Sequence, residues 1–196
     1  YDLAGFAVGV VDRCNIPDSS RVQEGDVVIA LPSSGLHSNG YSLARKIVLD
    51  VLGLPLDAPW DGGARTVGEE LLTPTRIYVN CVLPLIEAGL IRSMVHVTGG
   101  GLIENPPRSV PAGLGMDLDM SAWPVPPIFR RIQEAGVDSM EMARTFNMGL
   151  GFLMVVHPKD ESEVSRRLAA MGETHYRVGS ISRRPDDDRS TRLVGA

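Results

Sequence analysis

Three consecutive glycines form the part of this sequence best suited to bind an anion. Gly99, Gly100 and Gly101 stand between a short apolar run and a segment that can begin a helix. Glycine has no Cβ, so successive backbone N–H groups can turn toward one point and approach a ligand closely. A helix beginning directly behind the turn adds free N–H groups and the positive end of its dipole. The pattern predicts a phosphate-binding turn, with a plain flexible turn as the alternative.

Two further stretches combine glycine with polar side chains beside apolar segments. Residues 33–40 follow one apolar run, and residues 146–151 lead into another. Strand, polar glycine loop and helix N-terminus is the order in which α/β proteins build anion sites. Three such loops in one small chain favour a ligand site over three unrelated turns.

Composition narrows the classes of function. The chain has 196 residues, a net charge of −5, and no basic stripe with interleaved aromatic residues, which argues against nucleic acid as the principal partner. No apolar run approaches the length of a membrane span. Cys14 and Cys81 lie far apart and outside any metal spacing, so we expect reduced thiols in a cytoplasmic protein and no metal site. Because the chain starts abruptly at Tyr1, we expect a piece of a longer protein.

The elements that must position these loops alternate between strands and helices. We expect strands at residues 3–11, 26–31, 91–97, 115–120, 152–156, 175–181 and 190–194. We expect helices at residues 41–52, 67–72, 76–88, 128–135, 139–144 and 161–171. The predicted fold class is α/β, an α+β sandwich of one mixed sheet with helices packed on one face. No internal repeat or linker divides the chain, so we expect a single domain over residues 1–196.

Read together, these stretches resemble a known enzyme family. The resemblance rests on residues 1–6, 33–43, 72–78, 98–101 and 144–151, in this order along the chain. They are similar to the second half of aminoimidazole-ribonucleotide synthetase, also called phosphoribosylformylglycinamidine cyclo-ligase, an enzyme of purine biosynthesis. Each motif alone is modest, whereas the ordered set is specific.

The resemblance implies an activity and an architecture. The family uses ATP, with Mg²⁺ present, to phosphorylate the amide oxygen of formylglycinamidine ribonucleotide, after which an internal nitrogen closes the imidazole ring and ADP and phosphate leave. An N-terminal domain supplies most of the ATP and Mg²⁺ site and a dimer barrel, and a C-terminal domain lies across the cleft. This chain resembles the C-terminal, substrate-side domain of such a homodimer, so we expect it to be inactive alone.

The resemblance also implies roles for individual residues. It places His37 in the active-site cleft as a catalytic residue, and the alternative is a surface histidine bonded to a loop carbonyl. Thr98, Gly99, Gly100 and Gly101 are the candidates for the substrate's 5-phosphate. A second set of candidate ligand contacts comprises Ser34, Asn39, Arg76, Asn147 and Gly149.

Residues of this second set can also be explained by structural roles that involve no ligand. Asn39, like its neighbour Ser38, can cap the helix expected from residue 41. Arg76 would open a helix, where its charge opposes the dipole, so either an anionic ligand or an ordinary ion pair accounts for it. Asn147 can satisfy its own backbone at a bulge. Asp117 and Asp119 share one strand face, which we interpret as the solvent face of an edge strand.

Two other functions remain open on the sequence. One keeps the superfamily and changes the substrate, as in thiamine-monophosphate kinase or selenophosphate synthetase. The other is a non-catalytic metabolite-binding or dimerisation module.

Overall fold

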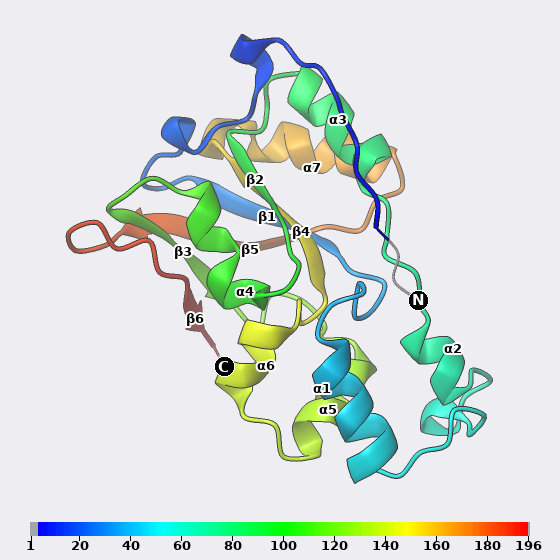
Figure 1. Cartoon of the computed structure of the whole chain (residues 1–196). Coiled ribbons are helices and arrows are strands. Elements are labelled where there is room, and N and C mark those ends of the chain that lie inside the picture. Colours follow the sequence, from blue (N-terminus) through cyan, green and yellow to red (C-terminus); the bar gives the residue numbers. More distant parts are fainter. Residues whose placement is uncertain (1–3, 196) are drawn as a thin grey trace.

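The protein is described by a computed structural model that covers residues 4–195 and, within them, leaves the side chain of Cys14 undescribed (Figure 1). Its centre is a six-stranded sheet in the order β2-β4-β1-β5-β3-β6. The strands are β1 (Val27–Pro32), β2 (Ser93–His96), β3 (Leu114–Asp119), β4 (Leu150–Val156), β5 (Tyr176–Arg183) and β6 (Arg192–Val194).

The sheet is mixed, as expected. Its neighbouring strands run antiparallel except for β3 and β6, which are parallel. The two central strands β1 and β4 are apolar almost throughout, because both of their faces are covered. The strands expected at residues 26–31 and 152–156 are therefore confirmed, with small shifts at their ends.

The connections form short helices. They are α1 (Tyr41–Arg45), which continues as a π-helix (Lys46–Val51), α2 (Val67–Leu71), α3 (Val79–Glu87), α4 (Gly101–Glu104), α5 (Pro127–Glu134), α6 (Ser139–Thr145) and α7 (Glu161–Ala170). Short 3-10 turns lie at Arg13–Asn15, Ser19–Arg21, Trp60–Gly62, Pro106–Ser109 and Pro158–Asp160.

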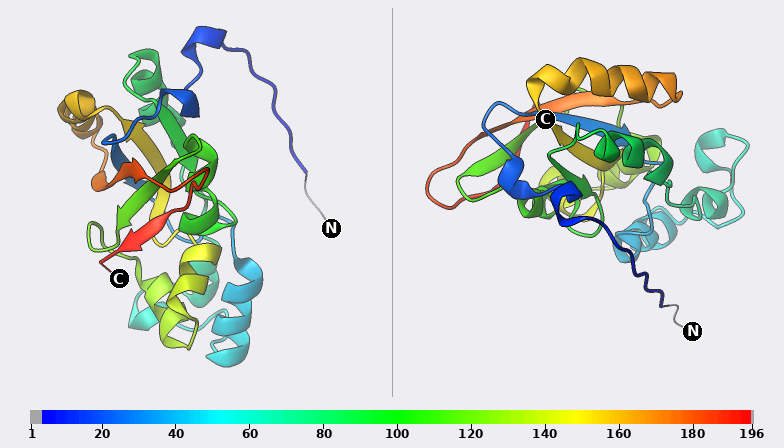
Figure 2. Two further views of the ribbon diagram at one scale, coloured as in Figure 1. Left: turned by 90° about the vertical axis from the view of Figure 1, so that its left-hand side faces the viewer. Right: turned by 90° about the horizontal axis from the view of Figure 1, so that it is seen from above.

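Helices cover both faces of the sheet, so the expectation of packing on one face is wrong. Alternation along β1 sends Val28 and Ala30 into a core shared with α1, α2 and α4 to α6. Val27 and Ile29 point the other way, into a core shared with α3 and α7. In the right-hand view of Figure 2, α7 and α1 lie on opposite sides of the strands. The mixed α/β class stands, with three layers in place of two.

The strand expected at residues 3–11 is not present in the part of it that the structure describes. Residues 4–11 form no strand and run away from the body of the fold (Figure 2, left). Their large side chains are exposed, with Phe6 at 92% and Val8 at 82%. Within residues 4–195 no layer covers this segment, so its apolar pattern does not produce a buried strand. Leu3 lies outside the described residues.

Two expectations about helix starts are also wrong. The helix α3 begins at Val79 rather than at residue 76, so the positive charge of Arg76 does not oppose a helix dipole. The residue that caps α1 is Gly40, in the left-handed region at φ 71°, and no side chain caps it. Asn39 instead donates from Nδ2 to the carbonyl oxygen of His37 at 2.7 Å, and Ser38 Oγ lies 3.4 Å from the hydroxyl of Thr75.

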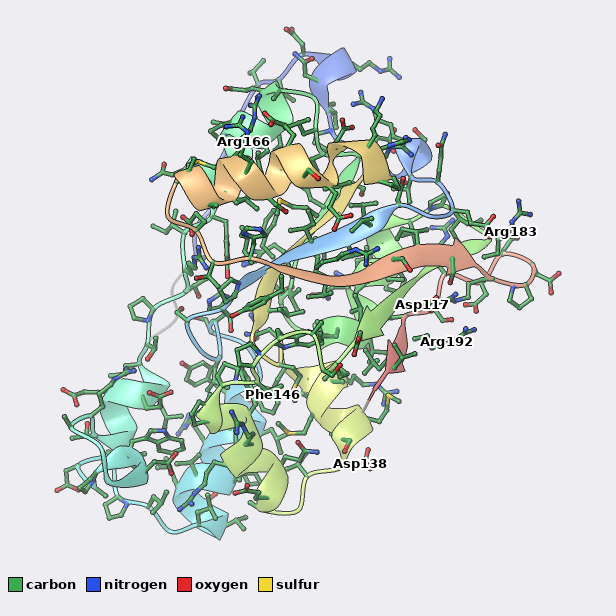
Figure 3. All side chains as sticks on the ribbon, turned by 180° about the vertical axis from the view of Figure 1, so that it is seen from behind. Asp117, Asp138, Phe146, Arg166, Arg183 and Arg192 are labelled. Atoms are coloured by element: carbon green, nitrogen blue, oxygen red, sulfur yellow. The ribbon has the colours of Figure 1, made fainter. Side chains whose placement is uncertain are left out.

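Asp117 does not lie on an edge strand, because β6 pairs outside β3. Its carboxylate accepts a hydrogen bond of 2.7 Å from the buried guanidinium of Arg184, in the loop that connects β5 to β6. Figure 3 shows Asp117 on β3 with Arg192 nearby on β6. These contacts give the aspartate a structural role in joining three strands.

Candidate functional site

Four of the motifs found in the sequence meet around the loop of residues 33–40. Ser34 donates from its hydroxyl to the carbonyl oxygen of Pro74 at 2.6 Å. Ser33 donates to Oδ1 of Asn147 at 2.9 Å. On the third side, a Cβ built on Gly99 would lie 3.7 Å from Oδ1 of Asn39. Stretches far apart in sequence are thus assembled into one region.

His37 lies at the centre of this assembly and is 2% exposed. Its Nε2 accepts backbone N–H groups from Ser34 at 3.0 Å and from Arg76 at 3.3 Å. An acceptor at Nε2 requires the neutral tautomer with its proton on Nδ1. Within the described residues Nδ1 has no hydrogen-bond partner, although it is buried.

The surroundings of His37 keep its ring neutral. Burial first, then the nearby imidazole of His96 and the charge of Arg76, lower the pKa of His37 from 6.5 to about 4. At neutral pH the ring therefore joins two motifs as an uncharged acceptor. Its catalytic role stays a prediction.

Asn147 is also buried, at 2% exposure, and holds the loop from below. Its Oδ1 accepts the Ser33 hydroxyl and the backbone N–H of Gly149, and its Nδ2 donates to the carbonyl oxygen of Gly35 at 2.8 Å. Gly149 has φ 98°, and a Cβ there would lie 2.4 Å from Pro126. Both residues shape the site through the loop, and direct ligand contact stays a prediction for each.

Arg76 contacts the end of β1 and the segment that follows α7. It donates from Nη1 to the carbonyl oxygen of Pro32 at 3.0 Å and pairs through Nη2 with Glu173. Its guanidinium also lies 5.1 Å from the ring centre of Tyr78. The ordinary ion pair considered from the sequence is thus present, and a contact with an anionic ligand remains a prediction.

The triple-glycine turn lies beside Asn39 at the surface. Gly101 is buried at φ 54°, and a Cβ there would approach the carbonyl oxygen of Ala143 to 2.2 Å and that of Phe146 to 2.6 Å. Figure 3 shows Phe146 beside the helices of this layer. Close packing therefore explains why a residue without a Cβ stands at position 101. Gly99 is exposed and Gly100 is partly exposed.

The backbone hydrogen bonds of the turn divide its donors into two groups. The N–H of Gly101 donates to the carbonyl oxygen of Thr98 at 3.0 Å, and the N–H of Thr98 donates to Oδ1 of Asn105 at 2.6 Å. Within residues 4–195, no hydrogen bond uses the N–H of Gly99 or of Gly100. These two adjacent amides are the ones that remain available to an anion.

An apolar groove of about 410 Å³ adjoins His37, and sequence reasoning missed it. Its walls come from the start of α3, from β2 and from β4, and include Arg76, Tyr78, His96 and Phe152. Tyr78 and His96 each lie about 6 Å, ring centre to ring centre, from His37. His96 stands in an apolar run of the sequence, yet alternation along β2 exposes it. That alternation was the signal available in the sequence.

A metal site does not fit the side chains that the structure describes. They contain no group of three His, Cys, Asp or Glu residues arranged to hold an ion. Cys81 is buried and free, and the expectation for Cys14 falls on a side chain outside the description. No helix in the described part of the chain has both the length and the apolar character to cross a bilayer.

The sequence matches one family over most of its length. Residues 23–190 match the family described as AIR synthase related protein, C-terminal domain. Phosphoribosylformylglycinamidine cyclo-ligase of Desulfitobacterium hafniense is 50% identical over 187 residues, which are 93% of this chain and 53% of that protein. The enzyme of the same name from Bacillus velezensis is 49% identical over 184 residues, with the same coverage. The chain spans about half the length of these curated relatives.

Solved structures agree on the fold. Thiamine-monophosphate kinase from Stenotrophomonas maltophilia superposes with a TM-score of 0.61 at 18% identity, over 94% of this chain and 55% of that one. The E. coli hydrogenase maturation protein HypE gives 0.56 at 18% identity, over 89% of this chain and 47% of that one. At such identities the likeness concerns the fold alone.

Proposed function

The chain belongs to the AIR synthase related protein family, C-terminal domain, and on this premise we propose that it is the substrate-side domain of a phosphoribosylformylglycinamidine cyclo-ligase. The observation that carries the proposal is about 50% identity over 93% of the chain to cyclo-ligases of which the match covers 53%. The domain then comprises residues 1–196, and an N-terminal half completes the enzyme.

The proposed reaction joins two chemical steps. ATP transfers its terminal phosphoryl group to the amide oxygen of formylglycinamidine ribonucleotide, which turns that oxygen into a leaving group. An internal nitrogen then attacks the activated carbon, phosphate departs, and loss of a proton completes the aminoimidazole ring. ADP is the other product. In this proposal ATP and Mg²⁺ are held mainly by the N-terminal half.

This chain's part is to bind and orient the nucleotide substrate. The unused amides of Gly99 and Gly100 are suited to the 5-phosphate, because they are adjacent, accessible and fixed by the turn. His37 holds the loop of residues 33–40 against Arg76, and so sets the wall of the site that faces the reacting atoms.

Exposed apolar surface supports the idea that a further domain packs here. Phe6 and Val8 are almost fully exposed, and the groove beside His37 carries exposed Ile77 and Val79. An apolar groove open at the surface is typical of an interaction site. A homodimer of the full-length enzyme in the cytoplasm completes the proposal.

A turnover assay on the full-length protein tests the proposal. With formylglycinamidine ribonucleotide, ATP and Mg²⁺ we expect stoichiometric ADP, phosphate and aminoimidazole ribonucleotide. Turnover of thiamine monophosphate in its place would move the protein to the kinase branch of the superfamily. Binding of the nucleotide without any ADP formation would favour a non-catalytic metabolite-binding module.

A further inference from the structure

The triple-glycine turn keeps a single conformation only if contacts from outside the turn restrain it. Gly100 has φ 100° and Gly101 has φ 54°, both in the left-handed region. Glycine has more backbone freedom to lose than any other residue, so an unsupported run of three samples many conformations. A turn that binds phosphate through two amides loses affinity whenever those amides point elsewhere.

The side chain of Asn105 provides this restraint through two hydrogen bonds to the backbone of the turn. It is 3% exposed, and its Oδ1 accepts the backbone N–H of Thr98 at 2.6 Å. Its Nδ2 donates to the carbonyl oxygen of Gly99 at 2.9 Å. One carboxamide therefore fixes the peptide units on both sides of the Thr98–Gly99 junction.

Only a carboxamide of this length performs both tasks at once. The site needs an acceptor for one backbone N–H and a donor for a backbone carbonyl, and both atoms must lie in one plane. An aspartate at position 105 would keep the acceptor but place a carboxylate against the carbonyl oxygen of Gly99. An alanine would remove the hydrogen-bond partner of the Thr98 N–H and the donor to the Gly99 carbonyl oxygen together.

The hydrogen bonds of Asn105 also determine which backbone amides of the turn remain free for a ligand. Asn105 takes the N–H of Thr98, and the carbonyl oxygen of Thr98 takes the N–H of Gly101. The amides of Gly99 and Gly100 are left over and lie next to each other. We propose that Asn105 is a positioning residue for phosphate binding, acting by fixing the orientation of these two amides. This inference rests on the proposed function, because it names what orders the proposed phosphate site.

Steady-state kinetics on the full-length protein separate this role from a general structural one. We expect Asn105→Asp to raise the KM for the ribonucleotide about tenfold or more, with the KM for ATP unchanged. The matched control is Ser109→Ala, a buried serine on the next turn whose hydroxyl donates to the carbonyl oxygen of Pro106 and not to the glycine turn. It should change neither constant. An unchanged KM for the ribonucleotide in Asn105→Asp would overturn the proposal.

Hydrogen exchange tests the same inference without turnover. In the wild-type protein, inorganic phosphate should slow exchange in a peptide covering residues 98–104. In Asn105→Asp, and in Asn105→Ala where it folds, that protection should be lost and basal exchange should be faster. Phosphate protection equal to wild type would contradict the role of Asn105. If the wild-type protein shows phosphate protection of residues 98–104 but turns over no ribonucleotide, the proposed function is contradicted and the role of Asn105 in ordering the turn still stands.

Discussion

The backbone N–H of Arg76 donates to Nε2 of His37 across 3.3 Å, and this contact joins two loops that are 39 residues apart in sequence. The same nitrogen accepts the N–H of Ser34. The neutral imidazole of His37 therefore accepts hydrogen bonds from two backbone N–H groups that would otherwise have no partner.

This arrangement predicts a pH dependence of stability. The pKa of His37 is about 4 in the folded chain and near 6.5 when unfolded, so the unfolded chain binds the proton more tightly. The free energy of unfolding should be highest above pH 6.5 and should fall between pH 6.5 and 4, by up to about 3 kcal/mol from this group. Urea unfolding across this range checks it against His37→Gln, which removes the titration. Parallel pH curves for the two proteins would contradict the prediction.

The role of His37 in turnover can be separated by the same substitution. Glutamine offers a carbonyl oxygen that can accept the Ser34 N–H, whereas alanine offers nothing. If the neutral acceptor is what matters, His37→Gln should keep at least about ten times the kcat/KM of His37→Ala in the full-length enzyme. Equal and severe losses in both variants would show that the imidazole itself takes part in proton transfer.

The glycines of the turn should separate binding from folding. Gly101→Ala should destabilise the fold strongly, by about 3 kcal/mol or more, because its Cβ would meet the carbonyl oxygen of Ala143. Gly99 does not have positive φ, and a Cβ there lies in ordinary contact distance of Asn39. Gly99→Val should therefore leave the unfolding midpoint nearly unchanged and weaken ribonucleotide binding about tenfold. Thermal melts and a binding titration measure the two effects, and wild-type affinity in Gly99→Val would count against the site.

The buried salt bridge between Asp26 and Arg92 should contribute more to the free energy of unfolding than an exposed salt bridge does. The carboxylate of Asp26 is almost fully buried and accepts two hydrogen bonds from Arg92, at 2.9 and 3.0 Å. Arg92→Met strands this charge and should cost about 3–5 kcal/mol. Arg166→Met breaks an exposed, solvent-screened pair with Glu163 and should lower the free energy of unfolding far less. Chemical denaturation compares them, and similar losses would contradict the assignment.

Periodicity in the sequence predicted the elements whose burial comes from within the chain. The apolar runs of β1 and β4 and the amphipathic pattern of α7 lie close to where they were expected, because their covering layers are part of the same fold. The same reasoning failed for residues 4–11. Their pattern requires a covering layer, and within the described residues none covers them.

The site could be predicted as a set of loops but not as a set of contacts. Glycine and polar residues beside strands indicated three loops that the structure does bring together. Ser38 and Asn39 had side chains suited to cap α1, yet they bond to Thr75 and to the His37 carbonyl because tertiary contacts offer these partners. Asn105 carried no local signal, because its hydrogen bonds depend on the path of a turn six to seven residues earlier.

A crystal structure of the full-length protein with formylglycinamidine ribonucleotide tests the central claim most directly. The account predicts phosphate oxygens within about 3 Å of the backbone nitrogens of Gly99 and Gly100, with the carboxamide of Asn105 still bonded beneath them. A substrate phosphate bound elsewhere, with both amides facing solvent or another part of the protein, would contradict it.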